Sequence, residues 1–145
     1  MNKPDKFIII DDDEQSNMIC KFVVKQAIDS NINISTYTQA LKGNDSINTE
    51  FQASDNTQHI ILLLDINMPE INGWEALNML TKLDDEVKNQ LHLFMFSSSI
   101  DPKDKNQAKE HPMVTGFIEK PLTVEKTRLL VEEALKNVKD SKQIF

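Results

Sequence analysis

Residues 60–65 have the sequence IILLLD, in which five apolar residues follow one another and end at an aspartate. An apolar run of this length without alternation is typical of a strand buried on both faces, as in a parallel sheet covered by helices. Two other runs are similar: Phe7–Ile10, which also stops at an aspartate, and Leu91–Phe96, which is apolar except for His92 and is followed by three serines. These runs predict the centre of a parallel sheet.

Helical patterns alternate with these strands. Apolar residues recur at three- and four-residue spacing in segments 18–27, 74–80 and 124–138, which predicts helices there. Segment 41–59 is polar and predicts a helix followed by a loop, and weaker strand patterns lie at 32–37 and 115–118. The alternation predicts an α/β fold, namely a doubly wound, five-stranded parallel sheet with five helices.

The length and composition indicate one domain. The chain has 145 residues, which suits a single core, and we expect this domain over residues 5–138, followed by a short polar tail at 139–145 and no output domain. The single cysteine, Cys20, excludes an internal disulfide, and its place in a helical pattern predicts a small core residue. No apolar run approaches the length of a membrane span, and residues 1–6 do not lead into a signal peptide, so we expect a cytoplasmic protein.

The net charge of the chain indicates which kinds of partner it can bind. The net charge is -7 and the sequence pI is about 4.9. Direct nucleic-acid binding needs a lysine and arginine footprint, and anionic membranes repel an acidic surface. We therefore expect protein partners, with no direct nucleic-acid or membrane contact.

Polar residues follow the predicted strands. Asp11–Asp13 follow the first strand, Asp65 the third, Ser97–Ser99 the fourth, and Lys120 the fifth. Ligands of open parallel sheets bind at the carboxyl ends of the strands, so these side chains are expected to meet. Several carboxylates in one crevice repel one another unless a cation lies among them, and oxygen ligands suit Mg²⁺. A phosphoryl group could then contact the metal, a serine hydroxyl and the lysine, with Asp65 as nucleophile.

This arrangement resembles the receiver domain of bacterial two-component response regulators. Four motifs carry the resemblance: IDDD at 10–13, LDINMP at 64–69 followed by Asn72 and Gly73, FSSS at 96–99, and FIEKP at 117–121. The resemblance covers nearly the whole of residues 5–138. It implies the flavodoxin-like topology of receiver domains.

The resemblance also implies a metal-dependent phosphoacceptor. Asp65 matches the residue that accepts the phosphoryl group, and the implied cofactor is Mg²⁺, with Mn²⁺ as a substitute. Asp11 and Asp12 match the acidic pair that holds the metal together with Asp65, and the backbone carbonyl of Asn67 matches a further ligand. Three consecutive aspartates leave open whether the pair is Asp11 and Asp12 or Asp12 and Asp13. We favour the first pair because Asp13 suits the N-cap of the following helix.

The remaining motif residues match a conformational switch. Ser97 matches the hydroxyl that turns toward the phosphoryl group, and Lys120 matches the lysine that pairs with it. Phe117 matches the aromatic residue that rotates inward, and the family has a cis peptide bond before the residue that matches Pro121. The chain has serine where threonine is frequent and phenylalanine where tyrosine is frequent, so the coupling to the output face could differ. That face comprises the fourth helix, the fifth strand and the fifth helix.

The resemblance therefore implies a signalling protein that is not a turnover enzyme. A sensor histidine kinase or a histidine phosphotransfer protein would supply the phosphoryl group to Asp65. Transfer would be self-catalysed and autodephosphorylation slow. The signal would then pass to an unknown downstream protein or onward in a phosphorelay.

Three alternatives compete with this hypothesis. A phosphatase of the haloacid dehalogenase type needs an aspartate as general acid two residues after its nucleophile, where this chain has Asn67. A flavodoxin-like electron carrier needs a hydroxyl- and glycine-rich loop after the first strand, where this chain has Asp11–Asp13. A degenerate receiver would bind partners without phosphorylation, and the complete set of site residues argues against it.

The chain's three histidines and its tryptophan are not expected to take part. His59, His92 and His111 are far apart in the sequence, and no metal-ligand spacing joins them. We therefore expect structural or surface roles for them, and a partly buried helix position for Trp74.

Overall fold

The computed structural model describes residues 3–52, 58–99 and 101–136. Within these ranges the chain forms five strands and six helices. The strands are β1 (Lys6–Ile10), β2 (Asn33–Tyr37), β3 (Ile60–Asp65), β4 (Leu91–Ser97) and β5 (Val114–Glu119). The helices are α1 (Glu14–Ala27), α2 (Ala40–Gln52), α3 (Gly73–Leu80), α4 (Asp85–Gln90), α5 (Pro102–Glu110) and α6 (Val124–Ala134). The predicted tail at 139–145 and part of the predicted loop before β3 lie outside the described residues.

The strands form one parallel sheet in the order β2-β1-β3-β4-β5. The predicted doubly wound, five-stranded α/β fold with flavodoxin-like topology is therefore confirmed. Strand β1 lies at the point where the strand order reverses, which places the carboxyl ends of β1 and β3 beside the crevice where such sheets bind ligands.

The number of helices differs from the prediction of five. Helix α3 ends at Leu80, and the hydroxyl of Thr81 donates to the carbonyl of Asn78 at 2.6 Å. The chain then turns and forms the short helix α4, whose first turn contains Asp85 and Glu86. Acidic residues at a helix N-terminus are stabilised by the helix dipole. Because α4 is six residues long and mostly polar, it has too few apolar positions to produce a helical period.

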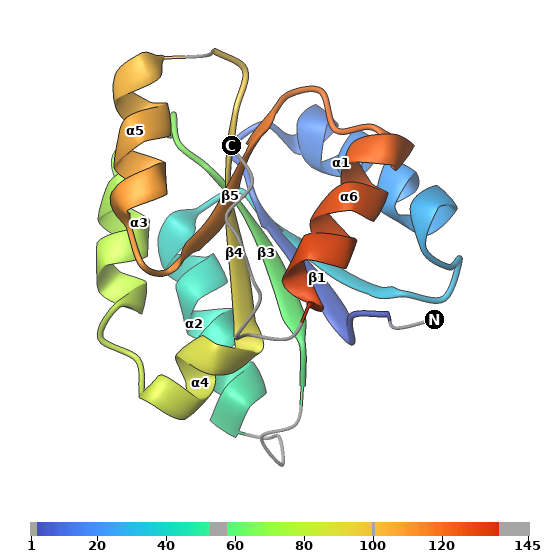
Figure 1. The fold of residues 1–145 in the computed structure, drawn as a ribbon, viewed down its shortest axis with the longest axis horizontal. Helices are drawn as coiled ribbons and strands as arrows, with labels where there is room; N and C mark the ends of the chain where they lie inside the picture. Colours follow the sequence, from blue (N-terminus) through green and yellow to red (C-terminus); the bar gives the residue numbers. More distant parts are fainter. Residues whose placement is uncertain (1–2, 53–57, 100, 137–145) are drawn as a thin grey trace.

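Helices cover both faces of the sheet. Helices α1 and α6 lie on one face of the sheet, and α2, α3 and α5 lie on the other (Figure 1). The two resulting clusters contain the alternate side chains of the same strands; for example, Ile61 and Leu63 belong to the cluster with α1, and Leu62 and Leu64 to the cluster with α2. Burial on both faces explains why the central strands are continuous apolar runs. Cys20 is buried on the α1 face, as predicted.

The described part of the chain contains no helix that could cross a bilayer.

Two histidines that are distant in the sequence are neighbours in the structure. His59 precedes β3, and His92 is the second residue of the adjacent strand β4. The Nδ1 atom of His59 lies 3.1 Å from the Nε2 atom of His92. The sequence did not predict this contact, because strand register rather than sequence spacing brings the two residues together.

Candidate functional site

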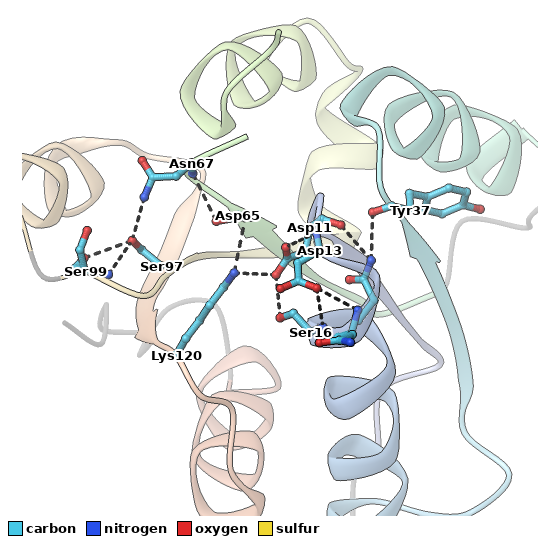
Figure 2. Close-up of polar contacts among 11 residues, drawn as sticks. Asp11, Asp13, Ser16, Tyr37, Asp65, Asn67, Ser97, Ser99 and Lys120 are labelled. Atoms are coloured by element: carbon cyan, nitrogen blue, oxygen red, sulfur yellow. Dashed lines mark hydrogen bonds and ion pairs between the residues drawn. The ribbon is translucent and has the colours of Figure 1, made fainter. Parts of the chain in front are cut away.

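Three carboxylates converge at the carboxyl ends of the strands: Asp11 follows β1, Asp12 is the next residue, and Asp65 ends β3. Figure 2 shows two of them, Asp11 and Asp65, on either side of the Lys120 ammonium group. One oxygen from each of the three lies within 4.8 Å of the others. Asp11 and Asp65 are 0% and 3% exposed, whereas Asp12 faces solvent. The cluster is therefore a mostly buried concentration of negative charge with one open side.

Lys120 is the cation that faces this cluster. Its Nζ atom lies 2.6 Å from Oδ2 of Asp11 and 3.6 Å from Oδ2 of Asp65. The Lys120–Pro121 peptide bond is cis, and the backbone N–H of Lys120 donates to the carbonyl of Ser97 at 2.8 Å. Burial opposes the charge on Lys120, but its hydrogen bond to Asp11 and the two carboxylate charges outweigh burial and raise the pKa of the ammonium group. Lys120 thus remains charged and offsets part of the acidic cluster.

The first turn of α1 holds Asp11 in place. The hydroxyl of Ser16 donates to Oδ2 of Asp11 at 2.9 Å, and the amide of Asn17 donates to the Asp11 carbonyl at 2.9 Å. Sequence reasoning did not identify Ser16 or Asn17. Their position one turn into the helix that follows the strand was the available signal. They fix the orientation of a carboxylate that has no access to solvent.

Asp13 has a different position from its two neighbours. Its side chain accepts hydrogen bonds from the backbone N–H groups of Gln15 and Ser16, so it is the N-cap of α1, as predicted. The carboxylates near Asp65 are those of Asp11 and Asp12. The geometry therefore favours Asp11 and Asp12 over Asp12 and Asp13 as the pair beside Asp65.

The environment of Asp65 disfavours its negative charge. Burial and the nearby charge of Asp11 raise its pKa to about 7. Lys120 and the backbone N–H of Asn67 act in the opposite direction but do not cancel the rise. An added cation would relieve this repulsion, which is a property expected of a metal-assisted site.

This shift predicts how stability depends on pH. Between the ordinary pKa of 3.8 and about 7, the folded protein holds a proton on Asp65 that the unfolded chain releases. The free energy of unfolding should therefore fall as the pH rises through this window, because the folded state binds more protons. Asp65→Asn should remove this contribution and be more stable than the wild type above pH 7. Denaturant unfolding of both proteins in chelator at several pH values measures the difference in their free energies of unfolding. Equal pH profiles would contradict the raised pKa of Asp65.

Ser97 ends β4 close to this cluster, and its hydroxyl is already engaged (Figure 2). It accepts a hydrogen bond from the amide of Asn67 at 3.3 Å and from the backbone N–H of Ser99 at 3.2 Å. It also donates to the carbonyl of Ser99 at 3.1 Å. Asn67 therefore connects the loop after β3 to the loop after β4. Its side-chain amide contacts Ser97, and its backbone N–H contacts the carboxylate of Asp65.

Two aromatic residues lie on the side of the sheet covered by α3 and α5. Phe117, on β5, is partly buried and packs against the core cluster there. Trp74 is also partly buried, as predicted, and its indole N–H donates to the carboxylate of Asp104 at 2.9 Å. This hydrogen bond connects the first turns of α3 and α5, a link that the sequence did not indicate.

Comparison with known families identifies the domain. The family model of the response regulator receiver domain matches residues 7–132, which is most of the chain. The protein belongs to the receiver domain family. The five-stranded parallel sheet is thus the fold of a receiver domain, and the resemblance inferred from the motifs is confirmed.

Solved structures support the same assignment. A two-component response regulator from Cytophaga hutchinsonii is 28% identical with a TM-score of 0.81, and the match covers 94% of this chain and 100% of that one. A response regulator receiver protein from Dyadobacter fermentans is 24% identical with a TM-score of 0.75, covering 91% and 98%. A two-component response regulator from Legionella pneumophila is 23% identical with a TM-score of 0.70, covering 91% and 98%. The latter two show the shared fold. No curated protein is significantly similar to the sequence.

The residues of this receiver domain fit the Mg²⁺ ion that the family implies. Asp11, Asp12 and Asp65 offer carboxylate oxygens close enough to share one cation, and hard oxygen ligands are those that Mg²⁺ prefers. Burial and the charge of Asp11 both raise the pKa of Asp65, and a cation among the three carboxylates would oppose this rise. Asp12 is exposed, so the site is open to an ion from solvent.

Proposed function

We propose that this receiver domain accepts a phosphoryl group on Asp65 in a Mg²⁺-dependent reaction. The donor is a sensor histidine kinase or a histidine phosphotransfer protein. One observation supports this most strongly: a buried carboxylate at the end of β3 lies between two further carboxylates and a lysine that contacts both Asp11 and Asp65. Structural burial alone would favour an apolar residue at this position, whereas phosphoryl transfer needs a nucleophile and positive charge together.

Each residue has a defined part in the transfer. A carboxylate oxygen of Asp65 forms a bond to phosphorus as the bond between phosphorus and the donor's histidine nitrogen breaks. Lys120, 3.6 Å from Oδ2 of Asp65, is placed to neutralise a phosphoryl oxygen. Asp11, Asp12, Asp65 and the carbonyl of Asn67 would hold Mg²⁺, which supplies further charge neutralisation when bound. Ser16 and Asn17 keep Asp11 oriented during the reaction.

The switch follows from the contacts of Ser97. Its hydroxyl would exchange its bonds to Asn67 and Ser99 for a bond to the phosphoryl group, since charged acceptors form the stronger hydrogen bonds. That movement would shift the loop between β4 and α5 and allow Phe117 to turn inward. The face formed by α5, β5 and α6 would then present a different surface to a downstream protein.

Labelling with a small phosphodonor tests the proposal. After incubation with acetyl phosphate and Mg²⁺, the intact mass should show one added phosphoryl group, because the site itself catalyses the transfer. Mn²⁺ should substitute for Mg²⁺, and a chelator should abolish labelling. The matched control is Asp65→Asn, which keeps the shape of the side chain and should show no gain. Absence of labelling in the wild type would instead favour a degenerate receiver that binds partners without phosphorylation.

The proposal also concerns the extent and the cellular location of the domain. We assign the function to residues 5–138 as one unit and place it in the cytoplasm, by analogy with receiver domains in general.

The phosphorylated form is expected to persist and to lose its phosphoryl group slowly, because the residue two positions after Asp65 is Asn67. Its amide donates to Ser97 and provides no general acid or base for hydrolysis.

A further inference from the structure

The contact between His59 and His92 lies at the amino ends of β3 and β4, whereas Asp65 lies at the carboxyl end of β3. His59 immediately precedes β3, and His92 pairs in register with Ile61 near the start of that strand. Asp65, by contrast, is the last residue of β3. The histidine pair and the acidic cluster are therefore separated by the length of one strand and do not share residues.

Both imidazoles occupy the face of the sheet covered by α1 and α6. His92 alternates along β4 with Phe94 and Phe96, which belong to the cluster on that face. The ring of His92 is half-buried and that of His59 is exposed, and the two planes are inclined by 22° with centroids 5.3 Å apart. The half-buried ring is held by the sheet, and the exposed ring leaves the pair accessible from solvent.

The spacing of the two nitrogens suits a transition-metal ion. A histidine nitrogen binds Zn²⁺ at about 2.0–2.1 Å. Two nitrogens bound side by side therefore lie about 3 Å apart at the right angle of a square-planar site, the geometry typical of Cu²⁺, and about 3.4 Å apart in the tetrahedral geometry of Zn²⁺. Here Nδ1 of His59 and Nε2 of His92 are 3.1 Å apart. In the metal-free protein one of these nitrogens donates its proton to the other in a hydrogen bond, with the roles set by the tautomers of the two rings. When that proton moves to the outer nitrogen of its ring, both facing nitrogens offer lone pairs to a metal and the pair loses no proton.

An acidic residue lies beside the histidine pair. The carboxylate of Asp5 accepts a hydrogen bond from the backbone N–H of His59 at 2.7 Å. The nearby Lys6, on β1, instead reaches Glu50 of α2 on the other face of the sheet. A negative charge next to the two imidazoles favours a bound cation.

We propose that His59 and His92 form a second metal site, which binds one divalent first-row transition ion of the Cu²⁺ or Zn²⁺ type. Two imidazole nitrogens provide the protein ligands, and water completes the coordination. Imidazole ligands select these ions over Mg²⁺, which prefers oxygen. The bound ion would join the amino ends of β3 and β4, away from the phosphoacceptor.

Copper titration in excess Mg²⁺ tests this site directly. Excess Mg²⁺ competes for the oxygen ligands of the acidic cluster but not for imidazole, and the loss of Cu²⁺ binding in histidine variants identifies the binding that the histidines provide. We expect one equivalent of Cu²⁺ with nitrogen couplings in its electron paramagnetic resonance spectrum. His59→Gln and His92→Gln should each weaken binding by roughly tenfold or more, and His111→Gln, the matched control, should leave it unchanged.

A stability measurement accompanies the titration. Zn²⁺ in excess Mg²⁺ should raise the thermal unfolding midpoint of the wild type and of His111→Gln, but not that of His59→Gln, because a ligand that binds the folded state stabilises it. His59 is exposed, so its substitution should leave the metal-free fold intact, which circular dichroism can verify. Copper binding of unchanged affinity in His59→Gln, or no copper binding by the wild type, would overturn the proposal.

Discussion

Lys120→Met should destabilise the metal-free domain by about 3 kcal/mol or more, because it leaves a buried carboxylate without its cation. Asp11 is 0% exposed, and Lys120 is the lysine 2.6 Å from it. Methionine preserves much of the side-chain volume, so the loss would report on charge rather than packing. Urea unfolding in chelator measures the change. Mg²⁺ should recover part of the loss, since it supplies positive charge to the same carboxylates.

The matched control is an ion pair on the surface. Lys3 lies 3.0 Å from Asp29, but both side chains are well exposed. Surface pairs typically contribute between zero and about 1 kcal/mol, so Lys3→Met should change stability little. Similar losses in both variants would show that Lys120 is not the electrostatic partner of a buried cluster. Lys120→Met should also label with acetyl phosphate far more slowly, because the transferred oxygens lose their cation.

Gly73→Ala should have the second large effect. A Cβ atom at this position would lie 2.4 Å from the backbone oxygen of Asp65 and 2.7 Å from the Cα of Ile66. The Gly73 N–H also donates to the Ile66 carbonyl at 2.9 Å, so the start of α3 lies directly on the segment after β3. Backbone atoms cannot move aside as a side chain can. We expect a loss of about 1–3 kcal/mol and slower labelling, as Asp65 is displaced.

Gly43→Ala makes the same chemical change at a more tolerant position. Its Cβ would lie 2.4 Å from Cδ1 and 2.6 Å from Cγ1 of Ile10, but both are side-chain atoms, which can shift where backbone atoms cannot. Gly43 lies within α2, where alanine favours the helix by up to about 1 kcal/mol. We therefore expect a small net change and normal labelling. If Gly73→Ala behaved like Gly43→Ala, the close packing of α3 on the Asp65 segment would be wrong.

The sheet was predictable because its strands are buried on both faces. Such strands are apolar along most of their length: Ile60–Leu64 has no polar interruption, and Leu91–Phe96 is interrupted only by His92 near its start. Strand β1 begins one residue before the predicted run because Lys6 reaches Glu50 with its ammonium group while the residue as a whole is buried. A lysine is read as a loop residue from sequence, although its long side chain allows this position.

The positions of the site residues were predictable for a related reason. A parallel sheet aligns the carboxyl ends of its strands, so the residues after β1, β3, β4 and β5 meet whatever their separation in the sequence. The bonds of Ser16 and Asn17 to Asp11 depend on where the first turn of α1 lies, and the contact of His59 with His92 depends on strand register. Neither kind of contact produces a periodic pattern in the sequence, because each joins single polar residues.

The most direct measurement of the central claim locates the phosphoryl group in the chain. Borohydride reduces an aspartyl phosphate to homoserine, which peptide mass spectrometry can assign to one position. After treatment with acetyl phosphate and Mg²⁺, we predict homoserine at position 65 in the wild type and none in Asp65→Asn. Homoserine at Asp11 or Asp12 in the wild type, or labelling without any change at position 65, would contradict the assignment of Asp65 as the phosphoacceptor.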